Sequence, residues 1–149
     1  MLQVVTNVRA LGLDVGARRI GVAVGDLEHG IAMPHSVVER AGLSRDADTV
    51  AVLVRHEGAK TVVVGLPLEL DGRRGHRARR VARFVEALVE RSGGAFEVTS
   101  WDERFSTHAA HRALRAVGTR RTRRKATVDA LAAQHILQGW LDAQNNARP

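Results

Sequence analysis

The sequence predicts an α/β fold with a mixed five-stranded sheet, in which an antiparallel hairpin joins parallel strands, and helices on both faces. Three observations lead to this prediction. Short apolar segments near the N-terminus alternate with the period of strands, the β-branched run KTVVVGL at 60–66 is typical of a strand buried on both faces, and apolar residues at helical spacing follow it. Right-handed crossovers between such strands place helices on both faces. A chain of 149 residues fits one domain, so we expect a single domain over 1–149.

The strands are expected in a definite order along the sheet. The first ends at Asp14-Val15-Gly16 and pairs with the second as a hairpin, and Pro34 marks the third as an edge strand or a bulged one. The first, fourth and fifth strands run parallel, so their carboxyl ends share the edge where open α/β sheets place their sites. The expected strands cover 8–16, 18–26, 31–39, 60–66 and 96–101.

The helices are predicted from capping residues and from apolar spacing. A serine, Ser44, is expected to cap the first helix, and Gly93-Gly94 ends the second, whose apolar face runs from Val81 to Val89. A third helix is expected over 107–116. A mobile arginine-rich link over 118–125 then leads to a last helix over 127–143, and a flexible tail begins at about residue 145.

The composition points to a nucleic-acid partner. The chain has 23 Lys and Arg against 16 Asp and Glu, a net charge of +7, and all of the cations except Lys60 and Lys125 are arginines. Arginine suits bidentate contact with phosphate, and the cations gather in two clusters, 73–83 and 112–125, which resemble a phosphate footprint. A codon bias toward arginine is an equally good explanation of the ratio.

Residue types and segments that the sequence lacks limit the kind of metal site and the cellular location that we expect. It contains no cysteine, so any metal must be held by carboxylates, histidines or carbonyls. No apolar run approaches the roughly 18 residues that span a bilayer, and the first nine residues do not resemble a signal peptide. We therefore expect a cytoplasmic protein without a membrane partner.

Acidic residues lie where the topology brings chain segments together. Asp14 ends the first strand, Asp102-Glu103 ends the fifth, and Asp129 heads the apolar face of the last helix. Each has an ordinary explanation, as a turn residue, a solvated loop or a favourable partner of a helix N-terminus. Together they suggest carboxylates that share divalent cations, because hard oxygen ligands select Mg²⁺ or Mn²⁺. Two such ions support phosphodiester hydrolysis.

Four motifs in order carry a family resemblance: LGLDVGARRIGVAVGD at 11–26, VVGLPLELDG at 63–72, DERFST at 102–107 and VDALAAQHIL at 128–137. With them the chain resembles the YqgF/RuvX family of RNase H-like nucleases, known as Holliday-junction resolvases and as pre-16S rRNA nucleases. The resemblance implies an RNase H-like fold, dependence on Mg²⁺ or Mn²⁺, and three acids that are both metal ligands and catalytic: Asp14, Glu103 and Asp129. The family commonly has Leu at the position of Phe105, a conservative departure.

Basic residues near these acids are candidates for substrate contact. Of Arg18 and Arg19, beside the Asp14 turn, we expect Arg18 to hold the scissile phosphate. We assign the flanking backbone to Arg73 and Arg74, although a solvated helix start explains these two nearly as well. The arginine-rich link supplies the remaining nucleic-acid contacts. They are Arg120, Arg121, Arg123, Arg124 and Lys125.

The roles of three other residues stay open. Asp102 is a candidate second acid behind the metal ligands. His108 and His111 have helical spacing and fit a surface pair better than a metal site or proton relay.

The sequence leaves the substrate open. Structured RNA such as a ribosomal precursor is preferred on the family resemblance, and a four-way DNA junction, which requires two active sites and hence a homodimer, is the alternative. A non-catalytic nucleic-acid-binding module is a third possibility, which metal-dependent cleavage would exclude. The Asp-x-Gly turn at Asp14 also resembles the phosphate loop of actin-like ATPases, but those enzymes clamp nucleotide between two such domains.

Overall fold

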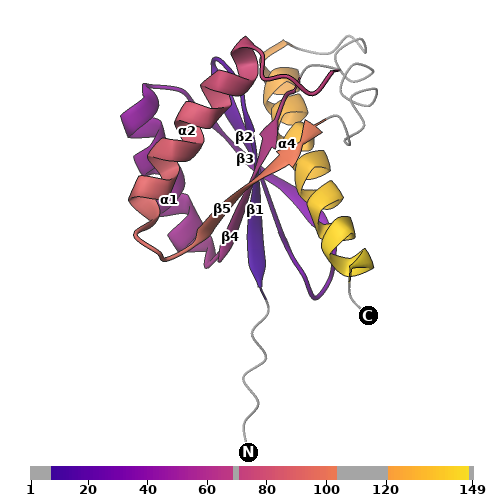
Figure 1. Cartoon of the computed structure of the whole chain (residues 1–149). Coiled ribbons are helices and arrows are strands. Elements are labelled where there is room, and N and C mark those ends of the chain that lie inside the picture. Colours follow the sequence, from indigo (N-terminus) through magenta and orange to yellow (C-terminus); the bar gives the residue numbers. More distant parts are fainter. Residues whose placement is uncertain (1–7, 69–70, 104–120, 148–149) are drawn as a thin grey trace, which may run out of the picture.

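A five-stranded mixed sheet forms the centre of the protein, in the order β3-β2-β1-β4-β5 (Figure 1). The computed structural model describes residues 8–68, 71–103 and 121–147. β1 pairs antiparallel with β2 and parallel with β4, β2 pairs antiparallel with β3, and β4 pairs parallel with β5. The predicted fold class is therefore confirmed. The strands are β1 (Arg9–Val15), β2 (Arg19–Asp26), β3 (Ala32–Glu39), β4 (Thr61–Leu66) and β5 (Glu97–Asp102).

The third strand has the edge position and the irregularity that its proline indicates. β3 lies at one end of the sheet, and its register with β2 shifts between Val22 and Ala23, where Ala23 is paired with Pro34. Proline cannot donate a ladder hydrogen bond, so it is tolerated where a strand has a free side or a bulge.

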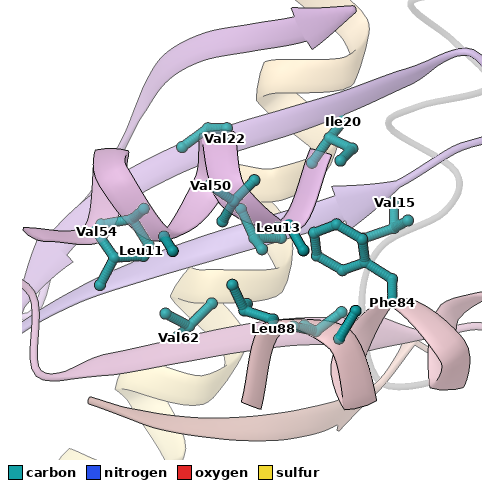
Figure 2. Close-up of a cluster of buried hydrophobic side chains, with 14 of the residues drawn as sticks. Leu11, Leu13, Val15, Ile20, Val22, Val50, Val54, Val62, Phe84 and Leu88 are labelled. Atoms are coloured by element: carbon teal, nitrogen blue, oxygen red, sulfur yellow. The ribbon is translucent and has the colours of Figure 1, made fainter. Parts of the chain in front are cut away.

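Two helices cover one face of the sheet and enclose the larger core. They are α1 (Leu43–Glu57) and α2 (His76–Ser92), which pack against each other and on the sheet. Figure 2 shows how Leu11 and Leu13 of β1 meet Val50 of α1 and Phe84 and Leu88 of α2. All of these side chains are at most 1% exposed. Because β1 alternates, every second residue belongs to this core.

A single long helix, α4 (Arg121–Asn146), covers the opposite face (Figure 1). A smaller core of alanines, Val63, Ile136, Leu137 and Leu141 lies beneath it. Gly12 makes this packing close, because a β-carbon at that position would stand 2.6 Å from the Leu137 Cβ. Trp101 and Trp140 pack against the same core.

Glutamines fasten α4 to the far edge of the sheet. Gln138 accepts a hydrogen bond from the Ala32 amide at 2.9 Å and donates to the Gly30 carbonyl at 2.8 Å. Gln134 donates to the Ala32 carbonyl at 2.9 Å. These contacts satisfy backbone groups at the start of β3 and fix the helix along its length.

The start of α1 differs from the prediction. Its N-cap is Gly42, without a capping side chain, and Ser44 lies inside the helix, where its hydroxyl accepts a hydrogen bond from Arg91 at 2.6 Å. The amides of Ala41 and Gly42 are instead bound by the carboxylate of Asp46, at 2.8 and 3.3 Å. The acid thus holds the two residues that lead into the helix, while the N-terminus of α1 has no side-chain cap.

The start of α4 also differs. The helix begins at Arg121, so the prediction of a link through Lys125 is wrong from Arg121 onward. Arginine, lysine and alanine are good helix formers, and a basic run without an apolar face can still continue a helix. At the other end α4 includes Asn145 and Asn146, where a flexible tail was expected. The helix predicted over 107–116 lies outside the described residues.

Among the residues that the structure describes, no helix is long and apolar enough to cross a membrane.

Candidate active site

Asp14 lies near the carboxyl end of β1 and on the face covered by α4. Leu11, Leu13 and Val15 belong to the opposite core, and Gly12 meets α4, so alternation puts the side chain of Asp14 on the helix side. Its antiparallel partner in the register is Gly21. Residues opposite each other across such a pair have Cα atoms about 4.5–5.5 Å apart, which places Gly21 directly beside the acid.

Asp129 reaches the same place from α4. Its backbone carbonyl lies against Gly21, where an added β-carbon would clash with it. Its carboxylate forms an ion pair with Arg19, whose Nε donates to Oδ2 at 2.9 Å. Both the main chain and the side chain of Asp129 are thus held by β2.

Glu103 follows the last residue of β5 and is only 6% exposed. Its Oε1 lies over Gly65 of β4, where a β-carbon would stand 2.5 Å away. Gly65 comes one residue after Val64, which pairs with Leu13, so it is a neighbour of Asp14 in the sheet. The absence of a side chain at Gly65 leaves the space that the Glu103 carboxylate occupies.

The environment of Glu103 favours its neutral form. Burial raises the pKa of its carboxyl group above the ordinary value, and the negative charge of Asp102 raises it further, whereas the charge of Arg77 partly opposes them. A carboxylate placed this way is stabilised by any additional positive charge. The role of Asp102 as a second acid behind the metal ligands stays a prediction.

The three acids converge on one edge of the sheet without forming a closed metal cage. Within residues 8–68, 71–103 and 121–147, no group of three or more acidic or histidine side chains has the arrangement of a metal site. The donor chemistry nevertheless fits a hard divalent cation, because all three candidate ligands are carboxylates. One of these acids, Asp129, is paired with Arg19 instead.

A buried ion pair supports the turn that follows Asp14. Arg40 Nε donates to Asp46 Oδ2 at 2.9 Å, and its Nη1 donates to the Gly16 carbonyl at 3.0 Å. The Arg40 amide also donates to the carbonyl of Arg18 at 2.9 Å. Hydrogen bonds to Asp46 outweigh the opposing effect of its burial, so its pKa lies below the ordinary value.

Sequence reasoning missed this support, because Arg40 and Asp46 carry no motif. The only signal was an acid in the first turns of a helix that lacks a good capping residue.

The basic residues divide into several environments. Arg18 is exposed at the turn between β1 and β2, and its contact with phosphate stays a prediction. Arg73 is also exposed, but its Nε donates to Asp71 at 2.6 Å, and the Arg74 carbonyl accepts from Arg79 at 3.1 Å. Arg77 is the cation of α2 whose charge lowers the pKa of Glu103, and nothing in the sequence distinguishes it from the other arginines of its cluster.

The remaining residues that were predicted to contact nucleic acid lie at the start of α4 or outside the residues that the structure describes. Four cations lie in the first turns of the helix, about 6 to 12 Å along its axis from Asp129. They are Arg121, Arg123, Arg124 and Lys125. Arg120, His108 and His111 lie outside the described residues.

This fold, with acids at the carboxyl edge of its parallel strands and under a covering helix, defines a nuclease domain of the RNase H-like class. The family model described as "RuvX: Holliday junction resolvase" matches residues 8–143, and the chain belongs to that family.

Relatives and a solved structure agree with this assignment. The chain is 38% identical over 143 residues to the "Putative pre-16S rRNA nuclease" of Acidiphilium cryptum, covering 96% of this chain and 89% of the relative. It is 42% identical over 135 residues to the protein of the same description from Myxococcus xanthus, covering 91% and 88%. The structure of T. thermophilus RuvC in complex with a Holliday junction substrate shares the fold with a TM-score of 0.60 and 16% identity, covering 94% of this chain and 97% of that one.

Proposed function

We propose that this protein is a nuclease that hydrolyses phosphodiester bonds in structured nucleic acid with the help of Mg²⁺ or Mn²⁺, and that its substrate is pre-16S rRNA. The observation that supports the proposal is that Asp14 is flanked in the sheet by Gly21, against which the backbone of Asp129 packs, and by Gly65, over which the Glu103 carboxylate lies. Membership in the RuvX family and the description of the relatives support the reaction class and the RNA substrate.

The three acids would hold the cation. When bound, a pair of divalent ions lowers the pKa of water and stabilises the charge on the leaving oxygen. The chain itself would contribute the negative charge of the acids, and the buried Glu103 would gain most from a cation because its own charge is poorly solvated. Arg40 and Asp46 contribute by holding the turn after Asp14 in one geometry.

The basic residues would bind the phosphate backbone around the cleaved bond. Arg18 borders the acids and is assigned to the scissile phosphate, and Arg73 and Arg74 are assigned to the flanking backbone. The basic residues at the start of α4, which precede Asp129 along the helix, are assigned to further backbone contacts. Contacts of this kind position the substrate and carry no sequence information.

A four-way DNA junction is the second candidate substrate, favoured by the description of the matching family. That activity requires two active sites and therefore a homodimer, which sedimentation would detect.

The proposal is tested by cleavage of equal amounts of a pre-16S rRNA fragment, unstructured single-stranded RNA and a four-way junction, each with Mg²⁺, with Mn²⁺ and with EDTA. We expect metal-dependent cleavage of the rRNA fragment, abolished in Asp14→Asn. Asp48→Asn is the matched control, because it makes the same chemical change at a side chain that is 65% exposed on α1. Cleavage of the junction alone would transfer the proposal to DNA. Binding without cleavage under any metal would reject the nuclease and leave a nucleic-acid-binding module.

A further inference from the structure

The ion pair between Arg19 and Asp129 joins two residues at opposite ends of the chain. Arg19 is the first residue of β2, and Asp129 lies about two turns into α4. The Nε to Oδ2 distance is 2.9 Å across 110 residues of sequence, and the two side chains are 20% and 22% exposed. The pair is therefore sheltered without being fully buried.

Docking of α4 does not depend on this pair. The helix is already fixed by Leu137 against Gly12, by the buried Ile136 and Leu141, and by the glutamine contacts with β3. An ion pair this sheltered is weak evidence for stability, because the cost of removing both charges from water offsets much of their attraction. Its specific geometry therefore points to a role other than holding the helix on the sheet.

The contact fixes the orientation of a carboxylate whose backbone is already fixed. The Asp129 carbonyl lies against Gly21, so the main chain cannot shift, and the hydrogen bond to Oδ2 then selects one rotation of the side chain. Carboxylates that ligate metals are commonly held in this way by a hydrogen bond to their second oxygen, which orients the first. Arginine suits the task because its planar guanidinium donates in a defined direction.

We propose that Arg19 is the positioning residue for Asp129, anchoring Oδ2 so that Oδ1 is the atom that ligates the divalent cation. This inference rests on the proposed metal-dependent nuclease function. It assigns to Arg19 a role different from that of its neighbour Arg18, which is exposed and directed to phosphate. In the alternative, Arg19 would compete with the metal for the Asp129 carboxylate, and the ion pair would have to break before the metal binds.

The test measures binding of Mn²⁺ alone to the full chain by titration calorimetry, without nucleic acid. Arg19→Met removes the donor and the charge but keeps the apolar stem, and we expect Mn²⁺ affinity to fall about 10–100-fold. Arg19→Lys keeps the charge without the planar donor and should give an intermediate loss. Arg45→Met, at an exposed position of α1, is the matched control and should bind Mn²⁺ as the wild type does.

A second measurement separates positioning from a structural role. At saturating Mn²⁺ the kcat of Arg19→Met should recover most of the wild-type value, while the Mn²⁺ concentration for half-maximal rate rises in step with the lost affinity. An unchanged Mn²⁺ affinity with a lower melting temperature would make Arg19 a structural residue and overturn the inference. A tighter affinity would identify Arg19 as a competitor of the metal and overturn it equally.

Asp14→Asn distinguishes failure of this inference from failure of the proposed function. If Asp14→Asn loses Mn²⁺ binding and Arg19→Met retains it, only the role of Arg19 is rejected. If the wild type binds no Mn²⁺, or Asp14→Asn binds it unchanged, the proposed metal site itself is rejected, and the inference with it.

Discussion

The backbone of Asp129 rests directly on Gly21, with no space for a β-carbon between helix and strand. Gly21→Ala should therefore push the start of α4 off the sheet at the position opposite Asp14. Because the neighbour is backbone and cannot rotate away, we expect a loss of about 3 kcal/mol in the free energy of unfolding. Urea denaturation measures this loss of stability. Nuclease activity should also fall under conditions in which the variant is still folded, because Asp129 is displaced. Ser100→Ala, at an exposed position of β5, should stay within about 0.5 kcal/mol of wild type; an equally small effect of Gly21→Ala would contradict the close contact.

The ion pair of Arg40 and Asp46 gives a pH-dependent contribution to stability. The pKa of Asp46 is lowered from an ordinary 3.8, so its charge stabilises the folded chain above that value, and this contribution is lost as pH falls through the lower folded pKa. At pH 7 we expect Asp46→Ala to cost about 3 kcal/mol, because it leaves Arg40 unpaired where its side chain is 14% exposed. Melting curves of both proteins between pH 7 and pH 2.5 should converge at the acid end.

Asp48→Ala removes a more exposed pair with Arg91 and serves as the control for Asp46→Ala. Its cost should be below about 1 kcal/mol at pH 7. A constant difference between Asp46→Ala and wild type at all pH values would rule out the charge of Asp46 as the cause.

The contribution of Glu103 to stability should have the opposite pH dependence to that of Asp46 in metal-free protein. Because its pKa is raised in the fold, the folded state binds the proton more tightly, so stability falls as pH rises from the ordinary value through the raised one. With EDTA present at pH 7, Glu103→Gln should therefore melt at a higher temperature than wild type, and this advantage should vanish near pH 4. Cleavage by Glu103→Gln should be lost. A variant that is less stable at pH 7 would show that the charged form is well compensated.

The basic start of α4 should contribute salt-dependent affinity. Changing Arg121, Arg123 and Arg124 together to Gln keeps helix propensity and removes three charges. Binding should weaken for every sequence tested, and the slope of log K against log salt should become shallower by about 0.7 per lost contact on single strands or about 0.9 on duplex. Arg45→Gln, on the opposite layer, should leave the slope unchanged. An unaltered slope in the triple variant would contradict phosphate contact by the start of α4 and would assign this contact to the cluster at 73–83.

Most of the fold could be predicted because it depends on local pattern. Alternation in β1 and β2, the β-branched run of β4 and the apolar spacing of α2 each report burial directly. The helix starts were harder to predict, since α1 begins after Gly42 without a side-chain cap and the first turns of α4 have no apolar spacing in the sequence.

The acids of the candidate site could be predicted from the sequence, but the arginines that contact the site could not. Asp14 and Glu103 lie at strand ends, a position that topology alone indicates. That Arg19 rather than Arg18 reaches Asp129, and that Arg40 reaches Gly16, depends on side-chain directions set by packing across distant segments. No spacing in the sequence encodes those directions.

The arrangement of α4 over β1 and β2 has a consequence for the order of synthesis. The sheet and the α1–α2 layer are complete in sequence before any of α4 is translated, and they can begin to fold as the chain emerges. Asp14 therefore takes its place in the sheet before Asp129 is available, because Asp129 belongs to one of the last segments to be synthesised. A nascent chain on the ribosome, surrounded by ribosomal RNA, therefore lacks one of the three acids of the proposed site until α4 has left the exit tunnel. The proposed site is therefore completed by a segment that is synthesised after the whole sheet and the α1–α2 layer.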